Sequence, residues 1–190
     1  TVAIGRFAGY NQNFTSATNS YNTAVGFQSG FAITTGIENT LIGALSGDAL
    51  TVGSSNIGIG LFALSSDTQG SRAVAIGRNA LATQNFTSAT ENYNVAIGYN
   101  AGLSVTTGVR NTLMGGLTGD SLTTGRDNVA IGYFALSSET ASDNSVAIGS
   151  HALQNQNNTS NVDVYNVAIG YNAGNSVTTG DRNTFIGSLS

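Results

Sequence analysis

An apolar residue followed by glycine recurs along the whole chain at a fixed set of intervals. The pair first occurs at Ile4-Gly5 and last at Ile186-Gly187, eleven times in all, and successive glycines lie 21, 17, 17 and 17 residues apart before the series restarts. A period of this length is typical of repeat proteins, in which each repeat stacks on its neighbours. One series spans 72 residues, so the chain divides into four-coil blocks at 1–72 and 73–144 and a truncated block at 145–190.

The residues around each glycine predict the fold class. Two apolar residues precede it, with Val, Ile or Thr before them, and further glycines and asparagines occur in the rest of the repeat, with no proline anywhere. Short strands joined by glycine-rich turns fit this pattern. We therefore expect an all-β fold, a parallel β-solenoid or β-roll of about eleven 17- or 21-residue coils that forms a rod about 50 Å long. Residues 1–190 form a single repeat region and are expected to be a fragment of a longer fibre, since open ends expose strand edges.

Both faces of each strand are apolar. The first and third residues of each apolar triplet, such as Val95 and Ile97, are expected to fill the solenoid interior, with Met114 among them. The middle residue is then expected to face outward, and a parallel strand with two apolar faces is normally covered on both. We expect a homo-oligomer with these middle residues at the candidate subunit interface: Ala3, Leu41, Ala75, Ala96, Leu113, Ala147 and Phe185. A monomer with an exposed alanine-lined face is the alternative.

Polar residues also form columns. Asparagine recurs four residues before the glycine, as at Asn22 and Asn94, and is expected to be a structural ladder of amide hydrogen bonds. Asp67 and Glu139 occupy a position that is otherwise apolar, and we expect them to face outward. His151 replaces Asn79 of the preceding block, which predicts a surface residue without a catalytic role.

Composition excludes several function classes. Charged residues make up 8% of the chain, the formal net charge is -4, and all six basic residues are arginine, so nucleic acid is not an expected partner. The chain has no cysteine, which excludes disulfides and thiolate metal sites. No run approaches the roughly eighteen apolar residues of a membrane span, so this segment is not expected to insert into a membrane.

No set of residues indicates catalysis or a cofactor, so neither an enzyme nor a resident cofactor is expected. A polysaccharide-acting β-helix enzyme stays open, because its catalytic groups would come from distant coils. A calcium site involving Asp127, Asp143 or Asp181 also stays open, although the known calcium-binding loop patterns are missing. The threonine column that includes Thr34 and Thr106 leaves ice binding as a further alternative, with a hydroxyl ladder as the structural one.

The three longest coils hold the best candidates for binding. Segments 10–22, 82–94 and 154–166 each carry four extra residues that must bulge from the rod. Loops on a rigid scaffold often bind ligands, and aromatic rings among amides can stack on sugars. The candidate receptor or glycan residues are Tyr10, Phe14, Tyr21, Phe86, Tyr93 and Tyr165. The alternative that these loops are spacers without a ligand has equal weight. Duplication of one ancestral block would copy the loop into every block, whether or not it binds anything.

A family resemblance rests on the strand motif itself. The run Asn-Ser-Val-Ala-Ile-Gly at 144–149, followed by Ala152, and Asn-Val-Ala-Ile-Gly at 94–98, 128–132 and 166–170 resemble head repeats of trimeric autotransporter adhesins. The runs at 183–187 and 106–108 resemble repeats of trimeric phage tail fibres and bacterial surface fibres. Coils of 17 and 21 residues exceed the usual head repeat.

This resemblance implies a left-handed roll, a homotrimer, and a location outside the cell, on a cell surface or a virion. It implies a structural and attachment role in a fibre that binds a surface glycan or protein receptor. A self-assembling extracellular filament without a receptor is the alternative.

Overall fold

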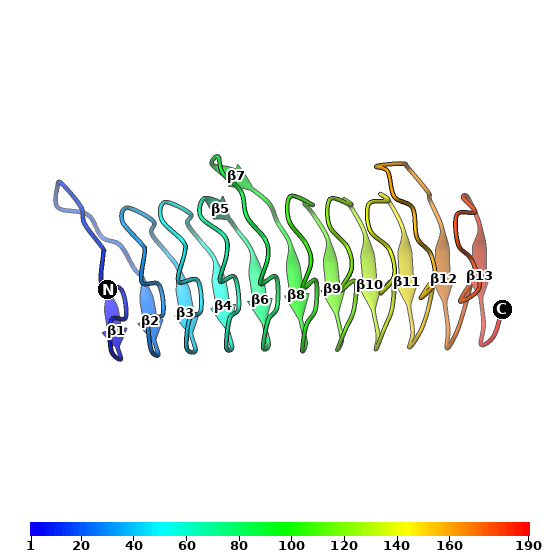
Figure 1. Ribbon diagram of the computed structural model, residues 1–190, viewed down its shortest axis with the longest axis horizontal. Coiled ribbons are helices and arrows are strands. Elements are labelled where there is room, and N and C mark those ends of the chain that lie inside the picture. Colours follow the sequence, from blue (N-terminus) through cyan, green and yellow to red (C-terminus); the bar gives the residue numbers. More distant parts are fainter.

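The computed structural model describes all residues 1–190 and is an all-β parallel solenoid without helices. Eleven coils stack along one axis, with the two termini at opposite ends (Figure 1). The prediction of a parallel β-solenoid of about eleven coils is thus confirmed. The strands are β1 (Val2–Ile4), β2 (Thr23–Val25), β3 (Thr40–Ile42), β4 (Ile57–Ile59), β5 (Gly70–Ser71), β6 (Val74–Ile76), β7 (Thr90–Glu91), β8 (Val95–Ile97), β9 (Thr112–Met114), β10 (Val129–Ile131), β11 (Val146–Ile148), β12 (Val167–Ile169) and β13 (Thr184–Ile186).

Eleven of these strands form one continuous sheet, in the order β1-β2-β3-β4-β6-β8-β9-β10-β11-β12-β13. Every pairing is parallel and joins equivalent positions of adjacent coils, as in Ala96 with Leu113 and Ala130 with Leu113. The four extra residues of a long coil therefore leave the register of the sheet unchanged. The other two strands, β5 and β7, pair at a bulge away from this sheet.

The orientation of the strands is opposite to the expected one. The middle residue of each strand points into the solenoid, and Leu41, Ala75, Ala96, Leu113 and Ala147 are 0% exposed within one protomer. The prediction that this column forms a subunit interface is therefore wrong. Ala3 and Phe185 occupy the same inward position in the two end coils and are more accessible because a neighbouring coil lies on one side only.

The first and third strand residues, with Met114 among them, point outward instead. The strand supplies only one inward side chain per coil because the interior is narrow and the turns fill the rest of it. Buried leucines, valines and isoleucines on the opposite wall include Ile33, Leu50, Val105 and Leu122. Sequence periodicity around the glycine could not reveal this wall, since it lies in segments without strand alternation.

Large and small residues exchange places between the strand and the following turn. Where the strand carries Leu113, the turn carries Gly119, and a Cβ added at that glycine would lie 2.9 Å from Leu113 Cδ2. Where the strand carries Ala130 or Ala147, the turn carries the buried Leu136 or Leu153. Leu41 and Leu113 also fill the space beside Gly30 and Gly102 of the preceding coils, where neither the strand nor the turn position holds a leucine. They therefore fill the solenoid interior, not gaps between copies.

The asparagine column lies inside the solenoid and forms the predicted ladder. Oδ1 of Asn94 accepts hydrogen bonds from the backbone amide of Asn111 at 2.9 Å and from its Nδ2 at 3.3 Å. Nδ2 of Asn94 in turn donates to the carbonyl oxygen of Gly108 at 2.7 Å. Each buried amide thus satisfies backbone groups of the turns, which a buried position requires.

Candidate functional site

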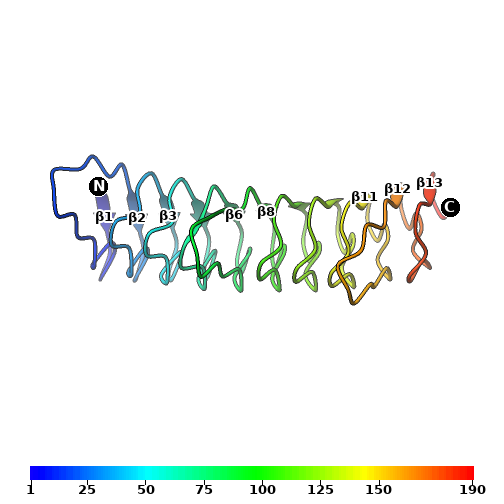
Figure 2. The ribbon, with the colours of Figure 1, turned by 90° about the horizontal axis from the view of Figure 1, so that it is seen from above.

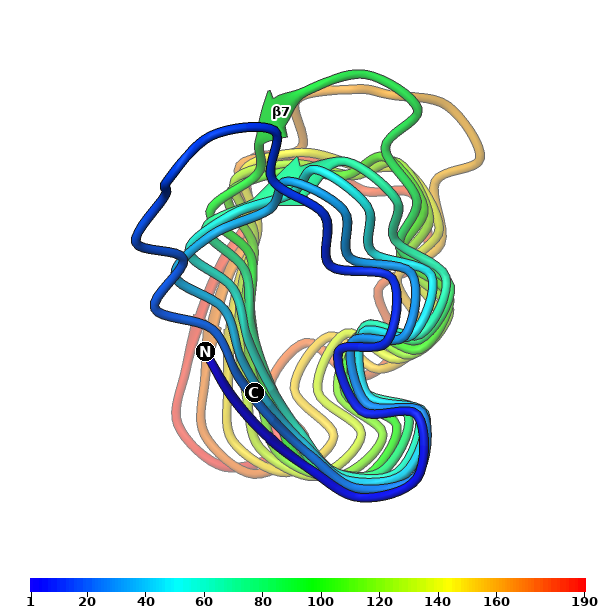
Figure 3. The same ribbon diagram turned by 90° about the vertical axis from the view of Figure 1, so that its left-hand side faces the viewer.

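The three long coils bulge from one edge of the rod, as expected (Figure 3). The middle bulge contains β7, which pairs with β5 of the preceding coil, and the third is joined to its neighbour by a bridge between Asp143 and Asp163. Of the candidate loop residues, Tyr10, Tyr21, Tyr93 and Tyr165 are exposed. The structure therefore displays tyrosines on all three bulges.

Two of the predicted loop aromatics are not displayed in this way. Phe86 is only 6% exposed, so its prediction as a receptor-contacting residue is wrong. Its backbone amide donates to Asp67 Oδ1 at 3.2 Å and its carbonyl oxygen accepts from Thr68 Oγ1 at 2.9 Å, which fixes the start of the bulge. Phe14 is half-buried and lines a polar cavity of about 530 Å³ at the N-terminal end.

Buried carboxylates anchor the bulges, contrary to the expectation that Asp67 and Glu139 face outward. Asp67 is 1% exposed, and its carboxylate also accepts from Gln84 Nε2 at 2.6 Å. Glu139 is fully buried and accepts from the amides of Ala141 and Ser142 and from Gln156 Nε2 at distances of 2.9 to 3.0 Å. An acid is tolerated at this otherwise apolar position because the next coil is a long one. Its glutamine side chain and a backbone amide at the start of the bulge donate hydrogen bonds to the carboxylate.

These carboxylates also begin the asparagine ladders. Gln84, which donates to Asp67, accepts from Asn94 through its Oε1, and Gln156, which donates to Glu139, accepts from Asn166 in the same way. Each of these two ladders of buried amides is therefore connected to a buried carboxylate at its first coil. Burial raises the pKa of Glu139, but hydrogen bonds from the Ser142 amide, Gln156 and the Ala141 amide outweigh it, and the pKa lies below its usual value. The acids are satisfied structural groups and are not arranged as a catalytic pair.

The exposed bulge tyrosines sit in small charged clusters. The Tyr93 hydroxyl donates to Glu91 Oε2 at 2.6 Å, which raises the pKa of the phenol, and the Arg72 guanidinium lies 5.7 Å from the ring centroid. Tyr165 has an equivalent arrangement with Asp163, which raises its pKa, and with Arg182. Each ring is thus held by a neighbouring coil while one side stays accessible.

The three carboxylates considered for calcium do not converge. Asp127 is paired with Arg110, which lowers its pKa, and Asp181 is paired with Arg182. Asp143 accepts from the backbone amide of Arg126 at 2.7 Å. No group of three or more His, Asp or Glu side chains is placed to hold a metal ion.

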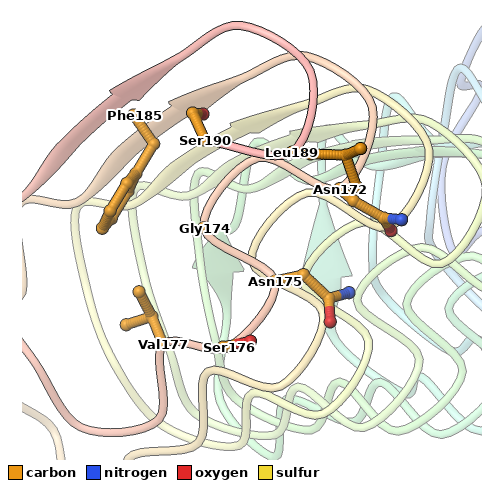
Figure 4. Close-up of a pocket in the computed structure, with 8 residues that line it drawn as sticks. All are labelled: Asn172, Gly174, Asn175, Ser176, Val177, Phe185, Leu189 and Ser190. Atoms are coloured by element: carbon orange, nitrogen blue, oxygen red, sulfur yellow. The ribbon is translucent and has the colours of Figure 1, made fainter.

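Both cavities lie at the ends of the rod. The C-terminal one has a volume of about 420 Å³ and a mixed lining, with the apolar Val177, Phe185 and Leu189 beside polar residues such as Asn172 and Asn175 (Figure 4). It is the open end of the solenoid interior. At the other end, Gln12 holds the position equivalent to Gln84 and Gln156, and its Nε2 is buried without a hydrogen-bond partner.

The outward face of the large sheet is the longest apolar surface of the molecule. We name it the aliphatic stripe, and it consists of the first and third residues of the eleven strands. These positions contain only valine, isoleucine, threonine and methionine. Ile42, Ile57, Met114 and Ile169 are exposed, and most other members are half-buried by their neighbours.

A second group of exposed aromatic residues lies outside the bulges and was not among the residues predicted from the sequence. The rings of Tyr133 and Phe134 meet edge to face at 4.4 Å, and His151 lies between Tyr133 and Tyr171 at 5.8 and 6.2 Å. The Ser150 hydroxyl is 3.0 Å from His151 Nδ1. The signal that could have found this group is a bulky residue directly after the glycine in every second coil.

No family model, curated protein or solved structure matches this chain. No helix long and apolar enough to span a membrane is present.

Proposed function

We propose that this chain is a shaft segment of an extracellular or virion fibre, in which three copies associate and the bulges attach the fibre to a surface receptor. The observation that carries the proposal is the aliphatic stripe. Each protomer already closes its own core, yet a parallel sheet of eleven strands keeps an uncharged apolar outer face. Parallel sheets are normally covered on both faces, and an apolar patch of this length marks an interaction surface.

A second copy is the partner that fits the stripe best. Its side chains repeat at one strand spacing, about 4.8 Å, over a rod about 50 Å long, and only another solenoid of this kind has the same repeat. With a width of about 10 Å, the stripe offers about 500 Å² per protomer, somewhat below the roughly 800 Å² per partner of a standard interface. The number three and the left-handed sense come from the resemblance to adhesin heads and tail fibres.

The bulges supply the attachment part of the proposal. They recur every four coils, about 20 Å apart, and carry exposed tyrosines on one edge of the rod. Several weak contacts to a surface glycan or protein would add through multivalency, especially in a trimer that triples their number. A rigid rod holds these loops at fixed separations, which flexible linkers do not.

The absolute mass in solution tests the assembly. We expect about three times the 19.3 kDa of one chain. Ile97→Glu combined with Ile131→Glu puts two charges in the stripe and should give folded monomers, since unpaired buried charges are costly. Val52→Glu is the matched control, because Val52 is an exposed apolar residue outside the stripe.

A folded wild-type chain that stays monomeric at high concentration would contradict the assembly. Attachment is read separately, by binding of the wild-type protein and of a Tyr93→Ala/Tyr165→Ala variant to bacterial or host surfaces. Unchanged binding with unchanged mass would assign the bulges as spacers, whereas no binding by the wild type would favour a filament without a receptor.

A further inference from the structure

One residue directly follows the glycine at the end of each strand of the large sheet. Along the whole rod, this position holds a bulky residue in one coil and a small or basic residue in the next. In the even-numbered coils it is bulky, apolar or aromatic and exposed, at 43, 37, 50, 52 and 55%: Phe27, Leu61, Tyr99, Tyr133 and Tyr171. In the odd-numbered coils it is small or basic: Arg6, Ala44, Arg78, Gly116, Ser150 and Ser188. We name the five bulky residues the aromatic row.

Backbone hydrogen bonds hold this row in register. The carbonyl oxygens of Tyr99, Tyr133 and Tyr171 each accept from the next coil, from the amides of Leu117, His151 and Leu189, at 2.8 to 2.9 Å. Members of the row are therefore two coils apart, about 10 Å. The coils stack along one long axis (Figure 2) and each is turned slightly relative to the last (Figure 3), so the row runs along the rod with a gradual twist.

The small residues between them let the rings lie along the row. A Cβ at Gly116 would be only 3.5 Å from Cδ2 of Tyr133, so that ring covers the glycine of the preceding coil. Phe134 and His151 pack against Tyr133 from the side, and His151 also lies beside Tyr171. The rings are thus held by their neighbours, while about half of each tyrosine remains accessible.

We propose that the aromatic row binds a linear β-1,4-linked polysaccharide, with alternate sugar rings stacked on Tyr99, Tyr133 and Tyr171. In such an extended chain each sugar is turned over relative to the one before it, so every second sugar presents the same face. The distance between these sugars is close to the spacing of two coils that separates the tyrosines. The apolar C–H face of a hexose packs on an aromatic ring, and a rigid tyrosine loses little conformational entropy on binding. An α-1,4-linked chain coils and does not keep this spacing.

Polar side chains beside the row match the sugar hydroxyls. The residue after each row position is Asn100 in the Tyr99 coil and Asn172 in the Tyr171 coil, and His151 lies between the last two tyrosines. A few placed polar groups beside apolar contact surfaces are typical of small-molecule and glycan sites. Single-stranded nucleic acid, which also stacks on aromatics, needs a positively charged groove, whereas this chain has a net charge of -4.

The row borders the aliphatic stripe but lies beyond the glycine, where the chain turns away from the sheet. It therefore stays at the margin of the proposed interface. The inference shares the attachment role proposed above but places a polysaccharide contact at a second site, apart from the bulges, and it does not depend on the number of copies.

Retention on insoluble cellulose and chitin, and on a soluble β-1,4-glucan in a native gel, tests the proposal, with amylose and dextran as comparison. We expect selective binding to the β-1,4-linked polymers. Tyr133→Ala should weaken it about tenfold, and Tyr99→Ala/Tyr133→Ala/Tyr171→Ala should abolish it. The triple Tyr→Phe variant keeps the rings and should bind nearly as well as the wild type.

A control removes two exposed rings that lie outside both the row and the bulges, in coils before Tyr99, with Phe7→Ala/Phe62→Ala, and should leave retention unchanged. Ser150→Tyr places a ring at one-coil spacing between Tyr133 and Tyr171. It should weaken binding if spacing matters, whereas a merely adhesive aromatic surface would bind more tightly.

Equal retention on amylose, tighter binding by Ser150→Tyr, or no effect of the triple row variant would each overturn the proposal. Loss of retention in Tyr93→Ala/Tyr165→Ala, with retention kept in the triple row variant, would assign the polysaccharide contact to the bulges instead. Mass measurements on the same variants separate these outcomes from a failure of the trimeric assembly, since the row lies outside the stripe.

Discussion

At the scale of single residues, the repeated glycine is required by backbone geometry. It has φ between 121° and 141° in all eleven coils, a region that residues with a Cβ rarely adopt. A Cβ there would also meet the carbonyl oxygen of the stacked glycine in the next coil, as at Gly132, where the distance to the Gly149 oxygen is 2.5 Å. The same residue therefore sets both the turn and the close stacking of the coils.

Gly132→Ala should lower the free energy of unfolding by about 1–3 kcal/mol from backbone strain, with the contact to Gly149 adding to it. Urea denaturation measures this. Gly116→Ala is the control, because Gly116 lacks a positive φ and its added Cβ would make an ordinary contact with Tyr133. Equal losses in both variants would show that the glycine column is not geometrically required.

Glu139 predicts a pH dependence of stability. Its folded pKa lies below the usual value of a glutamate, about 4.5, so its contribution to stability is present above that value and is lost as the pH falls through the folded pKa. Glu139→Gln should lower the free energy of unfolding by about 1–3 kcal/mol at pH 7. The NH2 group of the new glutamine would face the Nε2 of Gln156, so two donors would meet where a carboxylate oxygen now accepts. The difference in stability between the variant and the wild type should shrink below about pH 4.5. Thermal unfolding of both proteins at several pH values measures it. A difference that stays constant down to pH 3 would contradict this role.

At the scale of one coil, the strand and the turn share a fixed interior volume. In many coils a leucine comes from one side or the other, as in the pair Leu113 and Gly119 or the pair Ala130 and Leu136. The coil with Ala96 and Gly102 has none at these positions, and leucines of the adjoining coils fill its interior. Close packing makes either excess or missing volume costly. The leucines in the turn hold positive φ, at 54° for Leu136, and their complete burial offsets that strain.

This exchange predicts a strongly non-additive pair of substitutions. Leu113→Ala alone should destabilise the protein by about 2–5 kcal/mol through the cavity it leaves. Gly119→Leu alone should also destabilise it, because the new side chain meets Leu113. The double variant recreates the pattern of the next coil and should recover most of both losses, with a coupling of about 0.5–3 kcal/mol. Simple additivity of the two changes in urea denaturation would refute the exchange.

At the scale of the whole molecule, stability should scale with the number of coils, because each coil contacts only its neighbours. Deletion of 73–144 removes four of the eleven coils and places Gln156 one coil after Asp67, as Gln84 is in the intact chain. This shorter chain should fold, with a urea m-value reduced by about a third. Deletion of 73–148 also removes β11 and leaves only 13 residues from Gly60 to Gly149, about four too few for a coil, so this variant should be much less stable. Circular dichroism compares the two.

Much of the fold could be predicted because stacked coils convert sequence period directly into structure. The interval of 17 or 21 residues determined the parallel pairing, the number of coils, the asparagine ladder and the positions of the three bulges. Each of these follows from equivalent residues lying one strand spacing apart, whatever the side chains do.

Only the tertiary structure decided which face is inside. Val95 and Ile97 are larger and more apolar than Ala96, so hydrophobicity alone places them in the core. The observed choice depends on the volume that turn residues such as Leu81 and Val105 already occupy, and their side chains reach the interior from segments without strand periodicity. The burial of Asp67, Glu139 and Phe86 has the same cause, since the donors and space that receive them come from a neighbouring coil.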